Sequence, residues 1–266
     1  MRQYISPQAL DSNGFLTIGS KDYRYLKSVL RLAAGDMIHV RFPDGLLQPM
    51  TVCRIDEKNR KIFLQVCTVT ESGQSGENQP EETQTIESCQ FSLFMAVPKS
   101  SKFELIVRQA TECGISRIIP VQTEFSQTGA EKMNFRSDRF ERIIKEARQQ
   151  SGSPVNTQID SCIKLKDAAA LWKKETEGLS EKESLALVLY ERNDSTVSIL
   201  EAASSIKNSE GSIKKAAVFC GSEGGLSPQE IQILQEAGFI PVHLKTNILR
   251  CETAALYGIA SLQSLL

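Results

Sequence analysis

Residues 216–230 read AAVFCGSEGGLSPQE. The apolar beginning of this stretch, 216–220, predicts a buried strand, and the residues after it predict a glycine-rich loop followed by a helix. Ser227 and Glu230 have the spacing of a helix capping box, and Pro228 stands at the first helical position. A strand, a glycine loop and a helix N-terminus in this order are typical of a ligand-binding turn at the carboxyl edge of a parallel sheet.

The glycine loop lacks a phosphate-binding pattern. The sequence contains neither G-x-x-x-x-G-K-[ST] nor G-x-G-x-x-G, and Glu223 would repel an anion placed against the loop. A neutral or partly cationic ligand suits Glu223 better. A simple glycine turn with an exposed glutamate is the alternative interpretation.

A second candidate segment follows the apolar strand expected at 239–244. Residues 244–254 read LKTNILRCETA, in which Arg250 and Glu252 flank the start of a last helix, expected from about Glu252. Taken alone, this segment favours a simpler interpretation, in which Glu252 stabilises the helix dipole while Arg250 pairs with it on the surface. Two unusual segments at the carboxyl ends of strands together favour a binding site.

Strands and helices alternate beyond residue 88. We expect strands at 91–97, 115–121, 185–190, 216–220 and 239–244, and helices at 102–113, 138–150, 196–204 and 228–237. The polar stretches 173–184 and 204–215 predict surface loops. The alternation predicts an α/β domain with a mainly parallel sheet that helices cover on both faces.

The first 70 residues have a different pattern, with strands expected at 37–42, 46–55 and 61–69. A helix expected from Ser20 to near Gly35 carries a stripe of four cations, Lys21, Arg24, Lys27 and Arg31. Residues 71–88 contain five acidic residues and no lysine or arginine, which predicts a linker. We therefore expect a β domain over 1–70, a linker over 71–88 and an α/β domain over 89–266.

Composition excludes several classes of function. The 31 Lys and Arg residues against 32 Asp and Glu give a net charge of −1, so any basic surface must be local. Seven scattered cysteines without a C-x-x-C pair argue against a disulfide framework or a zinc knuckle, and two histidines disfavour a His-rich metal site. No apolar run approaches the roughly 18 residues of a membrane span, so we expect a cytoplasmic protein without a metal or a membrane partner.

These segments, in this order and at this separation, resemble the SPOUT-class methyltransferases, most closely the RsmE family, which methylates N3 of a uridine in bacterial small-subunit (16S) ribosomal RNA. Residues 25–31, YLKSVLR, look like part of that family's N-terminal RNA-binding β domain, and 109–115, QATECGI, resemble the opening of its catalytic domain. Residues 221–230 and 248–255 resemble its two cofactor loops. The sequence departs from the family at four positions, Ser153, Ser222, Lys245 and Asn247.

The resemblance implies an N-terminal PUA-like small β-barrel and a C-terminal SPOUT α/β domain with a deep trefoil knot, an exception among protein folds. S-adenosylmethionine would lie in the knot. The residues that the resemblance assigns to this cofactor are Leu189, Tyr190, Glu191, Gly221, Ser222, Glu223, Gly224, Leu244, Ile248 and Leu249. A homodimer is also implied, with the last helix, apolar at Leu256, Ile259, Leu262 and Leu265, either in the contact or in ordinary core packing.

Methylation at N3 requires that a proton leave the uridine and that the resulting charge be stabilised. Glu252 and Glu223 are candidate bases, which the sequence does not rank, and Arg250 is the candidate cation. RNA contacts are expected from Lys21, Arg24, Lys27 and Arg31, helped by Lys99 and Lys102, and the family implies the assembled small subunit as substrate. Two alternatives stay open: a SPOUT enzyme that methylates a ribose 2′-hydroxyl, and a non-catalytic RNA-binding or assembly factor.

Overall fold

The computed structural model describes residues 3–67, 89–180, 182–191, 196–207 and 213–266. The chain divides into two compact units. One consists of Met1–Glu82 with Arg148–Pro154, and the other consists of Thr83–Ala147 with Val155–Leu266. The linker expected at 71–88 lies outside the described residues.

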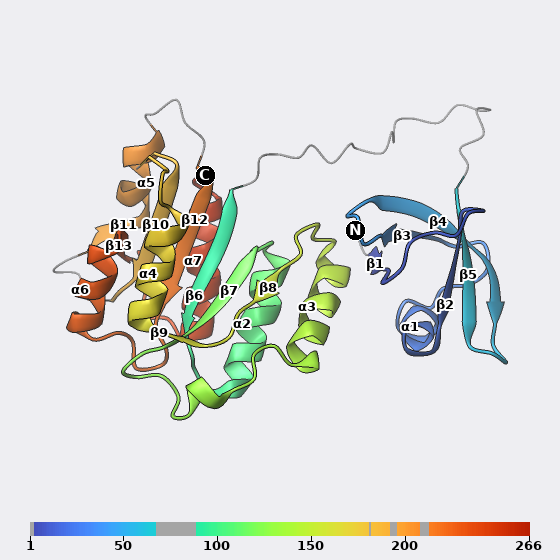
Figure 1. Ribbon diagram of the computed structural model, residues 1–266, viewed down its shortest axis with the longest axis horizontal. Helices are drawn as coiled ribbons and strands as arrows, with labels where there is room; N and C mark the ends of the chain where they lie inside the picture. The colour runs from blue at the N-terminus through green and yellow to red at the C-terminus, as the bar shows by residue number, and fades with distance from the viewer. Residues whose placement is uncertain (1–2, 68–88, 181, 192–195, 208–212) are drawn as a thin grey trace. The chain divides into compact units, whose positions relative to one another are not determined.

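The first unit contains a curled five-stranded sheet with the strand order β1-β3-β4-β5-β2 (Figure 1). Its strands are β1 Gln3–Ile5, β2 Phe15–Gly19, β3 Met37–Arg41, β4 Leu47–Asp56 and β5 Lys61–Val66. β1 pairs with β3 in parallel, and the other pairings are antiparallel. Alternate side chains such as Val40, Val52 and Leu64 fill the core of this unit. The sequence pattern predicts β3, β4 and β5 but not the short strands β1 and β2.

The helix expected from Ser20 to near Gly35 is shorter and irregular. It consists of an α-helical turn, α1 Ser20–Arg24, followed by a π-helical segment, η1 Tyr25–Val29. The N–H of Leu30 donates to the carbonyl of Tyr25 at 3.0 Å, and Arg31, with φ of 59°, ends the helix in the left-handed region. Because a π turn contains more residues than an α turn, the expected four-cation stripe does not continue to Arg31.

The second unit contains an eight-stranded sheet with the order β11-β13-β10-β12-β6-β7-β8, in which β9 also pairs with β7. The strands are β6 Gln90–Ala96, β7 Arg117–Gln122, β8 Gln158–Ile159, β9 Ile163–Lys164, β10 Ser184–Leu189, β11 Val197–Ser198, β12 Lys215–Cys220 and β13 Phe239–His243. Every described pairing in this sheet is parallel, as the alternating pattern predicts.

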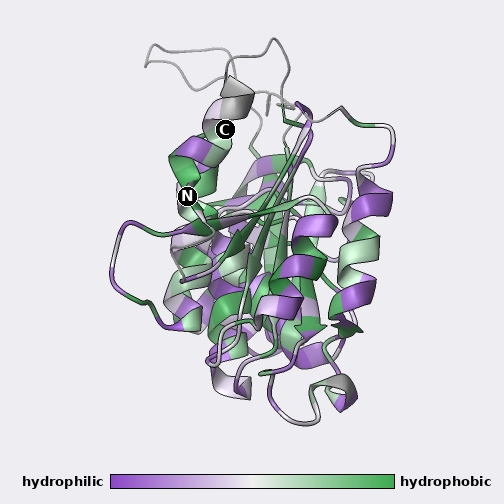
Figure 2. Cartoon of the chain, turned by 90° about the vertical axis from the view of Figure 1, so that its left-hand side faces the viewer, coloured by the Kyte–Doolittle hydropathy of each residue, from purple (hydrophilic) through white to green (hydrophobic). Residues whose placement is uncertain are grey.

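Helices cover both faces of this sheet, and Figure 2 shows its hydrophobic strands in green between them. They are α2 Ser100–Glu112, α3 Asp138–Ser151, α4 Leu165–Glu175, α5 Ile199–Lys207, α6 Pro228–Glu236 and α7 Cys251–Gln263, with a short 3₁₀ helix, η2 Ala130–Lys132. Successive side chains of β6 alternate between two cores: Leu93 packs with residues of α2, α3, α5 and α7, and Phe94 packs with residues of α4 and α6. Among the described residues, no helix is long and apolar enough to cross a membrane.

Two predictions about loops are wrong in part. The stretch 173–184 contains the last residues of α4, and the stretch 204–215 contains the end of α5 and the first residue of β12. α4 was not expected at all, because its N-cap position is held by Lys164, which makes no side-chain capping hydrogen bond. Without a capping residue, the sequence gives no start signal for that helix.

Candidate functional site

Neighbouring parallel strands end together beside a cavity of about 950 Å³. Three segments at the ends of these strands line the cavity. They are the end of β10 with the residues after it, 189–191, the loop after β12, 221–225, and the segment after β13, 244–250. Lys102 of α2, which follows the adjacent strand β6, lines it as well. The site is therefore at the carboxyl edge of the sheet, where open α/β sheets bind their ligands.

Glycines shape the loop after β12. The N–H of Gly225, which has φ of 73°, donates to the carbonyl of Ser222 at 3.0 Å and closes a tight turn. A Cβ atom at Gly224 would stand 2.6 Å from Cβ of Phe125, so this position has no room for a side chain. The hydroxyl of Ser222 donates to the carbonyl of Phe125 at 2.6 Å and fixes the loop against the segment that follows β7.

The start of α6 anchors the other end of this loop. The carboxylate of Glu230, which is buried, accepts hydrogen bonds from the N–H of Ser227 at 3.0 Å and from the N–H of Glu124 at 2.7 Å. This confirms the glutamate half of the predicted capping box. The same side chain also joins α6 to the segment after β7, a contact that the sequence did not reveal.

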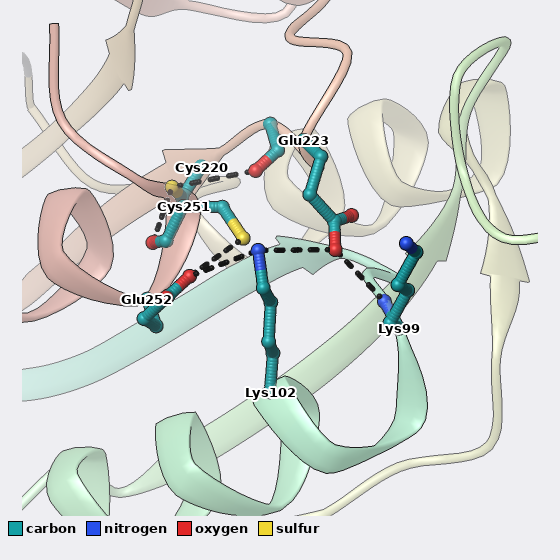
Figure 3. Close-up of polar contacts among 7 residues, drawn as sticks. Lys99, Lys102, Cys220, Glu223, Cys251 and Glu252 are labelled. Carbon is teal, nitrogen blue, oxygen red and sulfur yellow. Dashed lines mark hydrogen bonds and ion pairs between the residues drawn. The ribbon is translucent and has the colours of Figure 1, made fainter.

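Lys102, in the cavity wall, joins the carboxylate of Glu223, which also lines the cavity, to that of Glu252 in the first turn of α7 (Figure 3). Its Nζ lies 3.3 Å from Oε1 of Glu223 and 3.5 Å from Oε2 of Glu252. The backbone N–H of Lys99 also donates to Oε1 of Glu223, at 3.3 Å. The side chains of Lys102, Glu223 and Glu252 are 28%, 33% and 15% exposed, so solvent screens these ion pairs less than it screens pairs on an open surface.

Both carboxylates are held in the ionised form. Burial alone would raise the pKa of Glu223, but the backbone N–H groups of Glu223 and Lys99 and the Lys102 ammonium outweigh it and leave that pKa below its usual value. Burial would likewise raise the pKa of Glu252, and its own N–H, the Cys251 thiol and Lys102 together lower it. For Lys102, burial lowers the pKa, but Glu223, Cys251 and Glu252 raise it more, so its charged form is favoured.

Cys251 is not a nucleophile in this arrangement. Burial, followed by a hydrogen bond to Glu252, raises the pKa of its thiol to about 12, and its Sγ lies 3.3 Å from Oε2 of Glu252. The thiol of Cys220 donates to the carbonyl of Cys251 at 3.6 Å, and its pKa is raised by burial. Both thiols are therefore protonated at neutral pH and serve as packing and hydrogen-bonding groups.

The structure brings the residues predicted for the cofactor to one place. The cavity is lined by all of them: Leu189, Tyr190, Glu191, Gly221, Ser222, Glu223, Gly224, Leu244, Ile248 and Leu249. Arg250, also in the lining, is the N-cap residue of α7, and its guanidinium makes no ion pair among the described residues. The surface pair between Arg250 and Glu252 that the sequence left open does not form, because Glu252 contacts Lys102 instead.

The six cations predicted to bind RNA have different surroundings. Lys21, Arg24, Arg31 and Lys99 are exposed. Lys27 is half-buried and forms an ion pair with Glu57 at 3.4 Å. Lys102 lies in the cavity wall, and the sequence did not indicate this position because only the strand order places α2 beside the loop after β12.

The last helix is used mainly for core packing. Ile259 and Leu262, which the sequence offered for either a dimer contact or the core, are buried in the core of their own unit. Tyr257 and Leu266 are the large apolar side chains that α7 and its C-terminal end leave exposed. In the parts of the chain that the structure describes, no group of three or more His, Cys, Asp or Glu residues could hold a metal ion.

A parallel α/β sheet with a cavity beyond its carboxyl edge defines a broad class of enzymes that bind small organic ligands. Comparisons narrow this class. The RNA methyltransferase domain family matches residues 85–263, so the chain belongs to that family. This finding confirms the methyltransferase resemblance that the motifs indicated.

Relatives of full length agree with this assignment. The ribosomal RNA small subunit methyltransferase E of Rickettsia conorii is 25% identical over 268 residues, which cover 99% of this chain and 95% of the relative. A protein named ribosomal RNA small subunit methyltransferase E 2, from Borreliella burgdorferi, is 26% identical over 271 residues, which cover 100% and 98%. The crystal structure of the ribosomal RNA small subunit methyltransferase E of Neisseria gonorrhoeae, bound to S-adenosyl methionine, has the same fold, with a TM-score of 0.71, 21% identity and coverage of 100% and 98%.

Proposed function

We propose that this protein transfers the methyl group of S-adenosylmethionine to N3 of a uridine in small-subunit ribosomal RNA, on the assembled subunit in the cytoplasm. The observation that carries the proposal is the convergence of the segments after β10, β12 and β13 on one cavity in a chain of the RNA methyltransferase family. Relatives named for methylation of small-subunit ribosomal RNA extend over nearly all of the chain.

The cavity suits this cofactor by size and by chemistry. Its volume of about 950 Å³ is at the upper end of the range for small-molecule sites. Leu189, Leu244 and Leu249 offer apolar surface to a purine, and the loop at 221–225 offers backbone groups. The ionised carboxylate of Glu223 favours a ligand with a positive charge and disfavours a phosphate.

S-adenosylmethionine, when bound, supplies a methyl group activated by a positively charged sulfur. The chain must remove the N3 proton of the uridine and hold N3 in line with that methyl group. We propose that a carboxylate oxygen of Glu223 or Glu252 takes this proton. Lys102 makes both carboxylates weaker bases, so the N3 proton of the uridine must also be made more acidic. The guanidinium of Arg250 can do so by stabilising the negative charge that spreads to a carbonyl oxygen of the uracil ring.

We also propose the finer architecture that the resemblance implies: a PUA-like barrel over 1–70, a linker over 71–88, a knotted SPOUT domain over 89–266, and a homodimer. The insertion of β13 between β10 and β11 supports the knot. The exposed side chains Leu105 of α2 and Tyr257 of α7, two helices that contact each other, support a dimer contact at this surface. For the RNA, we propose the exposed cations Lys21, Arg24, Arg31 and Lys99 as contacts.

The test measures methyl transfer from labelled S-adenosylmethionine to small ribosomal subunits purified from cells that lack this protein, followed by mass spectrometry of the nucleosides. We expect N3-methyluridine with the wild type and a loss of at least about 100-fold with Arg250→Ala. Arg108→Ala, which removes an exposed arginine from α2, is the matched control and should retain full activity. A ribose-methylated product would indicate another SPOUT reaction, and the absence of any product on subunits and free RNA would indicate a binding factor.

A further inference from the structure

The Lys102–Glu223–Glu252 cluster joins three separate parts of the second unit (Figure 3). Lys102 comes from the first turn of α2, Glu223 from the loop after β12, and Glu252 from the first turn of α7. We propose that Lys102 is a positioning residue that holds both carboxylates in place and ionised, so that the cluster presents a single net negative charge to the sulfonium of the cofactor. This inference rests on the proposed function and deepens it, because it assigns the selection of the charged cofactor over its uncharged product to these three side chains.

The distances explain why a cation is needed between the carboxylates. Lys102 Nζ contacts one oxygen of each, at 3.3 and 3.5 Å, so both carboxylates lie within a few ångströms of the same point. Two carboxylates that share a site without a counter-ion repel each other, and one of them takes up a proton or moves away. With the ammonium present, two negative charges and one positive charge leave a net charge of −1, and both side chains stay anchored.

The other groups that face the cluster do not replace this ammonium. The thiols of Cys251 and Cys220 are protonated, and Lys99 contributes its backbone N–H rather than its side chain. The remaining titratable groups of the cavity wall are Tyr190, Glu191, His243, Lys245 and Arg250. Among the described residues, His243, Lys245 and Arg250 form no ion pair with Glu223 or Glu252, whereas Lys102 pairs with both.

The chemical class that such a cluster selects is an organic cation. S-adenosylmethionine and its demethylated product, S-adenosylhomocysteine, share the adenosine and amino-acid parts and differ in the methyl group and in the charge on sulfur. Contacts to the shared parts contribute equally to both affinities, so they do not change the ratio of the two affinities. That ratio therefore depends mainly on the charge that faces the sulfur. A variant that merely damages the fold weakens both ligands and leaves the ratio unchanged.

The experiment is calorimetric titration of both ligands, from about pH 3 to about pH 8, into the wild type, Lys102→Met and Lys102→Arg. In the wild type we expect S-adenosylmethionine to bind more tightly, and the preference to disappear only in acid, when the carboxylates protonate. Since Lys102 lowers the pKa of both carboxylates, its removal raises these pKa values. The pH at which half of the preference for S-adenosylmethionine is lost should therefore rise by about one unit in Lys102→Met. Lys102→Arg should follow the wild type because it keeps the charge.

Arg108→Met removes a cation from the same helix and is the matched control, so its midpoint should stay at that of the wild type. An unmoved midpoint in Lys102→Met, or an equal movement in Arg108→Met, would overturn the inference while leaving the proposed function intact. If Lys102→Met fails to fold, as measured by its thermal melting curve, Lys102→Gln is interpreted in the same way. Failure of the wild type to bind either ligand would instead overturn the proposed function, and the inference with it.

Discussion

Gly224 is a residue whose missing side chain determines the shape of the cavity. A Cβ atom there would meet Cβ of Phe125 at 2.6 Å, and the loop is tied to Phe125 by the hydroxyl of Ser222. We expect Gly224→Ala to displace the loop and to weaken S-adenosylmethionine binding by about tenfold or more, since overpacking typically costs about 1–3 kcal/mol. Calorimetric titration measures this loss.

Gly19→Ala is the control for this substitution, because no atom lies within 4 Å of a Cβ built there. Its cofactor affinity should equal that of the wild type. An unchanged affinity in Gly224→Ala would show that the loop yields without cost, and the tight contact with Phe125 would then have no role in shaping the site.

At the scale of residues, the sequence predicted those parts of the site that are continuous in the chain. Gly221, Glu223 and Arg250 belong to segments whose glycine content and helix-start signals are visible without a structure. Lys102 and Phe125 belong to the site only because β6 and β7 lie next in order after β12 in the sheet. Strand order is a property of long-range packing that local patterns do not encode, so the function of Lys102 as a partner of two carboxylates was not predicted.

Among the elements, α6 depends on one buried carboxylate. Glu230 accepts hydrogen bonds from the N–H groups of Ser227 and Glu124, and Glu230→Ala leaves both donors without their partner. The N–H of Ser227 is buried, and leaving such a group unsatisfied costs about 1–3 kcal/mol, so we expect the melting temperature to fall by about 5 °C. Differential scanning calorimetry measures the change.

The exposed neighbour Gln229 offers the matched control. Gln229→Ala should change the melting temperature by no more than about 1 °C, because it removes no buried contact. Equal melting temperatures for Glu230→Ala and Gln229→Ala would contradict the anchoring role of Glu230.

The helix of the first unit shows where periodicity misleads. An α-helical stripe assumes a constant turn, but η1 replaces that turn with a π-helical one, and Lys27 pairs with Glu57. Lys21 and Arg24 remain exposed on α1. A π-helical segment has no capping signal in the sequence at its start or its end. The exposed cations of α1 were therefore predicted, whereas the π-helical segment η1 was not.

This difference separates the cations by their expected effect on RNA binding. Replacing Lys21 and Arg24 by glutamine should reduce the slope of log affinity against log salt concentration by about two units, since each lost phosphate contact accounts for about one. Lys27→Gln should change it less, because Lys27 already has a partner in Glu57. Filter binding to small-subunit ribosomal RNA at several salt concentrations gives the slopes, and a slope that is the same in all variants would contradict this part of the proposal.

On the scale of the whole molecule, the proposed homodimer is directly testable. The side chains of Leu105 in α2 and Tyr257 in α7 are 42% and 45% exposed, and these two helices contact each other. The side-chain amide of Gln263 in α7 also donates a hydrogen bond to the carbonyl of Cys113, which follows α2. We expect the wild type to sediment as a dimer and the double variant Leu105→Glu, Tyr257→Glu to sediment as a monomer, because charges placed in an apolar contact are costly to bury. Leu200→Glu, at another exposed apolar position, is the control and should remain dimeric, whereas a monomeric wild type would contradict the proposal.

The position of β13 has a consequence for the order of events in folding. β13 is the last described strand in the chain, yet it pairs with β10 on one side and β11 on the other. Both pairings join segments that are far apart in the chain, and long-range pairing of this kind forms slowly. The 244–250 segment follows β13 directly and lines the cavity, so its position depends on the pairing of β13. The cofactor can therefore bind only when the sheet is complete. A high cofactor concentration would stabilise the native state relative to late folding intermediates by mass action.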